Sequence, residues 1–161
     1  MIVNIYMKRL MVLVIILLVS ACGYHLKASN TLAENYPKIK INISAQSLLK
    51  RSLVNVMLSS GVELVDKNME GVAELNISKD SLRKVVQSIG ANNQVQEYRL
   101  EYDVEYNIAE KSSKSIHLEK DYSFDIQQIG GGQQEEITLR KQLAQDMAWA
   151  IVRQLSLNTN K

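Results

Sequence analysis

The chain has 161 residues and a single cysteine, so it has the length of one domain and excludes an intramolecular disulfide. Its formal net charge of +2 at pH 7 comes from Lys8 and Arg9, because basic and acidic residues are equal in number after residue 21. A neutral domain is not expected to bind nucleic acid through its overall charge.

The first 21 residues have the three parts of a secretory signal. Lys8 and Arg9 form a positive start, Leu10 to Val19 is an unbroken apolar run, and two small residues precede Cys22. The apolar run is half as long as the roughly 20 residues that a helix needs to cross a bilayer. We therefore predict a signal over residues 1–21, with Met1 or Met7 as its start. A truncated membrane helix or a buried core helix is the alternative, which the order of the three parts disfavours.

Cys22 is predicted to carry a lipid anchor. Val19-Ser20-Ala21-Cys22 resembles the lipobox of bacterial lipoproteins, in which the cysteine becomes N-palmitoylated and carries an S-diacylglycerol. One acyl chain binds a membrane only marginally, at about 0.8 kcal/mol per buried CH₂, whereas several chains give a stable anchor. In such lipoproteins, an aspartate directly after the cysteine favours retention in the inner membrane. This chain has Gly23 at that position, so the resemblance is compatible with a location in the outer membrane.

The rest of the chain is predicted to be a tether over 22–37, a single domain over 38–157 and a polar tail over 158–161. Lys38 to Ile43 alternates strictly between polar and apolar residues, which is typical of a half-buried strand. Ser44 or Ser47 is placed to cap a helix that Gly61 ends. That helix is indicated by residues that recur at spacings of three and four: Leu49, Leu53, Val56, Met57 and Ser60.

Several strands are predicted next. Val62 to Val65 is a short strand or an extended exit from the helix. Ala73 to Ser78 is the next strand, Lys79-Asp80 is a bend or a bulge, and Leu82 to Ile89 continues as extended chain. The clearest pattern spans Glu97 to Ile108, where six apolar or aromatic residues alternate with six polar ones. Ile116 to Ile126 is its expected hairpin partner. Its inward-facing candidates are Leu118, Tyr122 and Phe124.

The chain is predicted to end in a second long helix. Gly130-Gly131-Gly132 is interpreted as a flexible hinge before it. Apolar residues then recur at steps of four: Leu139, Leu143, Met147, Ile151 and Leu155. The order of elements predicts an α+β fold in which two helices pack on one face of a mostly antiparallel, four- to five-stranded sheet.

No arrangement of catalytic groups is evident in the sequence. His25 and His117 are the only histidines, and neither has the spacing of a metal ligand. There is no Gly-x-Ser-x-Gly motif, and the glycine triplet lacks the Lys and the Ser or Thr of a phosphate-binding loop. We therefore predict no enzymatic activity, no cofactor and no metal site.

Two groups of residues on the Glu97–Ile108 strand have alternative interpretations. Three carboxylates on one face, those of Glu101, Asp103 and Glu105, are the right groups for Ca²⁺ binding or acid–base chemistry, but a solvated strand face is favoured. On the other face, three tyrosines could line a ligand pocket, although a tyrosine-rich face under helices is usually core. These tyrosines are Tyr98, Tyr102 and Tyr106.

Several short motifs, in order behind the lipobox, resemble the lipopolysaccharide-assembly lipoproteins of the LptE family. They are Cys22-Gly23-Tyr24-His25-Leu26, Gly61 to Lys67, Glu97-Tyr98, Asp121 to Asp125, and the helical pattern from Glu135 to Leu155. Together they cover nearly all of the chain after the signal. The resemblance implies a non-enzymatic plug in the lumen of LptD, an outer-membrane β-barrel. It also implies that the lipoprotein helps the barrel assemble and assists lipopolysaccharide insertion into the outer leaflet.

The same resemblance makes LptD and lipopolysaccharide the expected partners and places the anchored domain at the periplasmic side and in the barrel lumen. Candidate lipopolysaccharide contacts are Arg83, Lys84 and Lys120, since phosphate recognition uses Arg and Lys. The segments Gly90–Gln96 and Ile126–Glu136 contain neither residue. The alternatives are a stand-alone outer-membrane lipoprotein that binds a lipid or small ligand, which a cavity beneath the helices would support, and a lipid-anchored enzyme.

Overall fold

The computed structural model describes residues 31–67, 69–123 and 129–157. The predicted signal, Cys22, His25, Phe124 and the polar tail lie outside the described residues. The elements are α2 (Thr31–Asn35), β1 (Lys38–Asn42), α3 (Leu48–Ser59), β2 (Glu63–Leu64), β3 (Ala73–Ile89), β4 (Val95–Ile108), β5 (Lys114–Ser123) and α4 (Ile129–Leu157).

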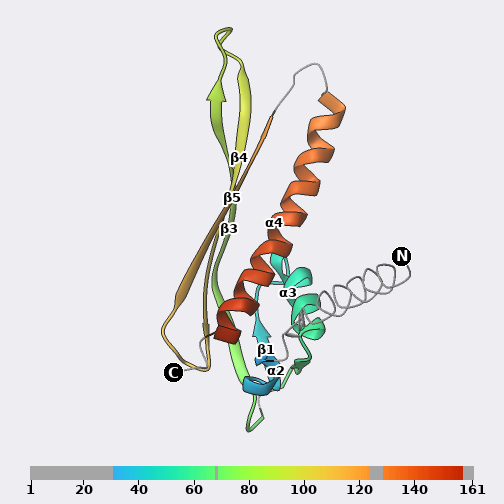
Figure 1. Ribbon diagram of the computed structural model, residues 1–161, viewed down its shortest axis with the longest axis vertical. Helices are drawn as coiled ribbons and strands as arrows, with labels where there is room; N and C mark the ends of the chain where they lie inside the picture. Colours follow the sequence, from blue (N-terminus) through green and yellow to red (C-terminus); the bar gives the residue numbers. More distant parts are fainter. Residues whose placement is uncertain (1–30, 68, 124–128, 158–161) are drawn as a thin grey trace, which may run out of the picture.

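The strands form one mixed sheet, and the helices lie on one of its faces (Figure 1). The strand order is β2-β1-β3-β4-β5, and the long strands pair antiparallel. This arrangement confirms the predicted α+β fold. The sheet is mixed because β1 runs parallel to both β2 and β3. Parallel neighbours need a crossover connection, which α3 supplies between β1 and β2.

A long hairpin of β3 and β4 extends beyond the start of α4 (Figure 1). β3 is continuous over 17 residues, with a register shift between Ile77 and Lys79, just before the Lys79-Asp80 position where a bend or bulge is predicted. The turn is closed by a hydrogen bond from Gly90 N to Gln94 O at 2.8 Å, and Asn93 adopts a φ of 58°. Asn tolerates this left-handed conformation better than most residues, which is why it suits the turn.

The core lies between the sheet and the helices. Alternation along β4 places Leu100, Tyr102 and Val104 at 0% exposure, which confirms the predicted inward face. The side chain of Ser47 accepts a hydrogen bond from Leu49 N at 3.1 Å and caps α3. The two long helices contribute the other layer of the core: Leu49, Leu53, Val56 and Met57 from α3, and Leu143, Met147, Ile151 and Leu155 from α4.

Two segments differ from the sequence prediction. α4 begins at Ile129, so the hinge predicted at the glycine triplet is wrong and these residues form the first turn of the helix. Glycine costs only about 1 kcal/mol per residue relative to alanine, which a 29-residue helix tolerates. Residues 31–36, predicted to be part of the tether, form α2 and the residue that follows it, and Leu32 and Tyr36 are buried. A five-residue helix has too few turns to show a periodic pattern in sequence.

Among the described residues, no helix combines the length and the apolar character needed to cross a membrane.

Candidate functional site

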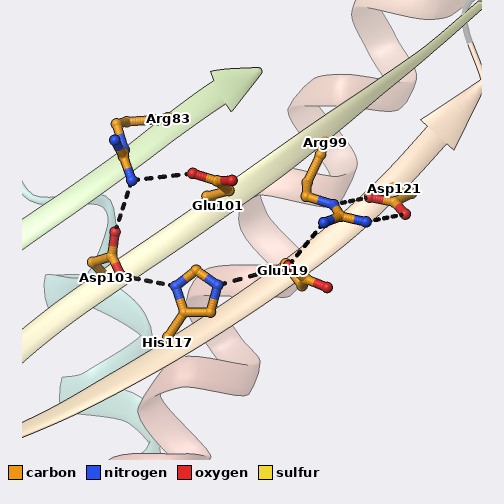
Figure 2. Close-up of polar contacts among 7 residues, drawn as sticks. All are labelled: Arg83, Arg99, Glu101, Asp103, His117, Glu119 and Asp121. Atoms are coloured by element: carbon orange, nitrogen blue, oxygen red, sulfur yellow. Dashed lines mark hydrogen bonds and ion pairs between the residues drawn. The ribbon is translucent and has the colours of Figure 1, made fainter. Parts of the chain in front are cut away.

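The side of β3, β4 and β5 that the helices leave uncovered carries a network of charged residues, which we call the ion-pair face. In antiparallel strands, residues directly opposite each other point to the same side of the sheet. Arg83 pairs in register with Glu101, and Asp103 pairs with His117. The residues drawn in Figure 2 are Arg83, Arg99, Glu101, Asp103, His117, Glu119 and Asp121.

The contacts of the ion-pair face run across all three strands (Figure 2). Arg83 Nη2 lies 3.0 Å from Glu101 Oε2 and 3.3 Å from Asp103 Oδ2. Asp103 Oδ1 lies 2.8 Å from His117 Nδ1, and the other ring nitrogen of His117 lies 3.7 Å from Glu119. The charged side chains of each strand are therefore held in place by contacts with side chains of the neighbouring strand.

Arg99 makes the closest contacts of the network. Its Nε lies 2.6 Å from Asp121 Oδ1 and its Nη2 lies 3.0 Å from Asp121 Oδ2, so the guanidinium binds this carboxylate with two parallel hydrogen bonds. Arg99 Nη1 also lies 3.2 Å from Glu119. Through Arg99, β4 is therefore connected to the last few residues of β5.

The three carboxylates of β4 that could suit Ca²⁺ are paired with protein cations. Glu101 and Asp103 contact Arg83, and Glu105 lies 3.7 Å from Lys79. Over residues 31–67, 69–123 and 129–157, no cluster of three or more metal-ligating side chains is present. The ion pairs of Glu101, Asp103 and Glu105 with Arg83 and Lys79 are those expected of a charged strand face.

Hydrogen bonding shifts the titration of the exposed pairs. The hydrogen bond to Asp103 raises the pKa of His117 above 6.5, and the same contact lowers the pKa of Asp103. The guanidinium of Arg99 likewise lowers the pKa of Asp121. Because these groups are in contact with water, solvent screening makes the pairs modest contributors to stability.

On the opposite side of the sheet, Glu136 of α4 holds a second polar cluster together. We call its five residues the clasp: Lys84, Tyr98, Tyr122, Glu136 and Arg140. Glu136 accepts hydrogen bonds from Lys84 at 2.7 Å, from the Tyr122 hydroxyl at 2.7 Å and from Arg140 at 2.8 Å. The clasp therefore ties the first part of α4 to β3 and β5.

Two further observations explain why Glu136 and Lys84 of the clasp carry their charges. Burial disfavours the charged form of Glu136, but the hydrogen bonds from Lys84, Tyr122 and Arg140 outweigh it and lower the pKa of Glu136 to about 2. Lys84 Nζ also lies 3.9 Å from the centre of the Tyr98 ring, within the range of a cation–π interaction. The cation is thus held between a carboxylate and an aromatic face.

The structure separates the three predicted lipopolysaccharide contacts. Arg83 is on the ion-pair face, whereas Lys84 and Lys120 are on the helix side, where both pair in register with Leu100. Lys120 donates a hydrogen bond to Gln142 Oε1 at 3.2 Å. Each of the three has a partner within the chain. Glu136 and Arg140 are not among the site residues predicted from sequence, although their i,i+4 spacing is a signal for a helical ion pair.

Tyr102 and Tyr106 of β4 are part of the core, and Tyr98 packs against it. The Tyr102 hydroxyl donates to Asp80 at 2.7 Å, and the Tyr106 hydroxyl donates to Gln154 at 2.7 Å. Burial raises the pKa of Tyr106 to about 12. The cavity beside Tyr106, lined also by Tyr36 and Leu155, has a volume of about 20 Å³, enough for one water molecule. This cavity between Tyr36, Tyr106 and Leu155 is itself too small for a lipid or a small ligand.

The fold and these two surfaces define a two-layer α+β domain with a covered apolar sheet face and an open charged one. A protein-family model described as LptE, lipopolysaccharide-assembly, matches residues 36–155. The chain therefore belongs to the LptE family. No curated protein matches the chain at a significant level.

Solved lipoprotein structures share the fold. A minor lipoprotein from Acinetobacter baumannii superposes with a TM-score of 0.66 at 22% identity, covering 76% of this chain and 92% of that one. The rare lipoprotein B from Shewanella oneidensis gives 0.64 at 23% identity, covering 74% and 93%. An uncharacterized lipoprotein B from Nitrosomonas europaea gives 0.65 at 23%, covering 77% and 84%. At these identities the likeness concerns the fold alone.

Proposed function

We propose that this chain is an outer-membrane lipoprotein that plugs the LptD β-barrel, helps it assemble and assists insertion of lipopolysaccharide into the outer leaflet. The observation that carries the proposal is the family match over residues 36–155, which spans nearly all of the described domain. The two-sided sheet supports it, because the helices pack on one face and the other carries charged side chains that suit polar surroundings.

The physical character of the domain fits a barrel interior. The lumen of an outer-membrane barrel is polar, and the ion-pair face offers hydrogen-bonding groups along three strands. β5 is an edge strand of ten residues, and such edges invite unwanted pairing unless they are covered. Enclosure would cover this edge, so a plug role gives the exposed strand a protected environment.

Cys22 is the proposed attachment point to the membrane. N-palmitoyl and S-diacylglycerol groups at Cys22 would hold the domain at the outer membrane on the periplasmic side. Cys22→Ala is expected to abolish incorporation of a radioactive fatty acid, because no other cysteine is available. Continued labelling of this variant would refute the anchor, and Ser20→Ala, which keeps a small residue, is the matched control that should still be labelled.

Lipopolysaccharide is the proposed cargo, and the proposed role is binding without catalysis. Arg83, Lys84 and Lys120 stay the proposed phosphate contacts. Each would have to exchange a protein partner for a phosphate oxygen, and this is easiest for Lys120, whose partner Gln142 is neutral. A charged partner such as Glu136 competes more strongly, since hydrogen bonds between ions are about twice as strong as neutral ones.

Capture of the partner tests the function. The tagged full-length protein is extracted from native outer membranes in a gentle detergent, and the co-purified proteins are identified by mass spectrometry. We expect a large β-barrel protein of the LptD type in amounts comparable to the lipoprotein. Recovery of the lipoprotein as a monomer, with no barrel protein attached, would contradict the proposed function.

A further inference from the structure

We propose that the ion-pair face is the docking surface for the protein partner, and that the partner's facing wall is rich in Arg and Lys. This inference rests on the proposed function and adds the chemistry of the contact.

Acidic groups outnumber cations on the ion-pair face. The strand register directs six carboxylates to this side: Glu97, Glu101, Asp103, Glu105, Glu119 and Asp121. It directs three permanent cations there: Lys79, Arg83 and Arg99. His117 adds a fourth positive charge only when it is protonated, so the face is acidic in either state.

The excess of carboxylates over cations belongs to this face and not to the chain as a whole. Basic and acidic residues are equal in number after residue 21, so cations must be in excess elsewhere in the chain. The clasp shows the opposite balance, because Lys84 and Arg140 share the single carboxylate Glu136. The two sides of the same three strands therefore present opposite charge.

The ion-pair face does not suit an apolar partner or a membrane. Among the described pairs on this face from Asn76–Asn107 to Ser88–Glu97, and among those between β4 and β5, Val85 is the only apolar residue. Burial of apolar surface can therefore supply little of the binding free energy. An anionic lipid surface would be repelled by the excess of carboxylates. A hydrogen-bonding protein wall with positive side chains is the complementary partner.

The carboxylates are already held in position. Asp103, for example, contacts both Arg83 and His117, and its side chain is only 23% exposed. A partner arginine can then bind a carboxylate with little loss of side-chain freedom, which is the usual cost of such contacts. Glu97 and Glu105 are the most available groups, since Glu97 accepts a hydrogen bond from Ser88 and Glu105 lies 3.7 Å from Lys79.

Charge reversal of these two groups tests the inference. The double variant Glu97→Lys with Glu105→Lys is compared with Glu70→Lys combined with Asp146→Lys, which makes the same change of charge at exposed sites outside the ion-pair face. Co-purification of the barrel from native membranes is measured over a series of NaCl concentrations. We expect the first double variant to lose about tenfold or more of the bound barrel at low salt. The control should keep it, and binding of the native protein should weaken as salt rises.

Equal capture by both double variants would overturn the docking surface while leaving the proposed function intact. Failure of the native protein to capture any barrel would overturn both. A thermal melt of each purified full-length variant, followed by circular dichroism, checks that the domain is folded.

A second measurement keeps the test independent of folding defects. A photo-crosslinking amino acid is placed at Ser81 or Ser115, which lie on the ion-pair face opposite Asp103 and Glu105. We expect crosslinks to peptides of the barrel that contain more Arg and Lys than Asp and Glu. The absence of crosslinks at both positions, or crosslinks to acidic or apolar peptides, would refute the inference.

Discussion

The two sides of β4 perform different physical tasks although their residues alternate along one strand. The even-numbered residues Leu100, Tyr102 and Val104 are fully buried against the helices. The odd-numbered residues Glu101 and Asp103 lie on the ion-pair face and bind cations of the neighbouring strands. The difference separates stability from recognition: burial on one side supports the fold, and charge on the other is available for a partner.

The comparison also explains why the ion pairs are not a reserve of stability. Exposed pairs typically contribute between about 0 and 1 kcal/mol, because water competes for each charge and salt screens them. Fully burying one large apolar side chain contributes about 1.5–3 kcal/mol. Variants on the two sides of β4 should therefore differ strongly in their effect on unfolding.

The largest expected effect is that of Tyr102→Asp. It would remove a fully buried ring and place a carboxylate beside Asp80, to which the native hydroxyl donates its hydrogen bond. We expect the free energy of unfolding to fall by at least about 4 kcal/mol, from the lost packing and an unpaired buried charge. Urea unfolding followed by circular dichroism measures it.

Glu101→Gln is the matched control on the adjacent residue of the same strand. It removes one charge next to an arginine that is 59% exposed. The free energy of unfolding should change by no more than about 0.5 kcal/mol. Equal losses in the two variants would mean that the two sides of β4 are not physically distinct.

An intermediate effect is expected for Glu136→Gln in the clasp. The pKa of Glu136 is lowered from 4.5 to about 2, so the ionised group stabilises the fold above pH 4.5. This contribution is lost as the pH falls through the range between 4.5 and about 2. Melting temperatures measured across that range should fall less steeply in the variant than in the native protein. Parallel curves for the two proteins would show that the clasp does not couple α4 to the sheet.

The sequence predicts the alternating parts of the fold well and the irregular parts poorly. The strict alternation from Glu97 to Ile108 is enough to fix which side of β4 is buried, because a strand directs successive side chains to opposite faces. The parallel pairing of β1 is not visible in Lys38 to Ile43, since alternation looks the same in both orientations. Pairing direction is decided by contacts far apart in the chain.

The candidate site also has parts that can be predicted from the sequence and parts that cannot. The row of Glu101, Asp103 and Glu105 can be predicted from sequence, but the identity of its cations cannot. Arg83 and His117 reach these carboxylates through the register of β3 and of β5 with β4, and a bulge shifts the register of β3. The clasp joins residues 52 positions apart, and only the packing of α4 over the sheet brings Glu136 to Lys84.

The smallest effect is expected from His117 and Asp103 on the ion-pair face. Because the hydrogen bond to Asp103 raises the pKa of His117 above 6.5, the protonated pair stabilises the fold below pH 6.5, and this contribution is lost as the pH rises through the raised pKa. NMR titration of the imidazole should show that Asp103→Asn lowers the pKa of His117 toward 6.5. Glu119→Gln should lower it less, since Glu119 lies 3.7 Å from the ring compared with 2.8 Å for Asp103. If Glu119→Gln lowered the pKa of His117 more than Asp103→Asn did, the ring would be held mainly by Glu119 of its own strand, β5. The cross-strand pair with Asp103 of β4 would then be the weaker contact.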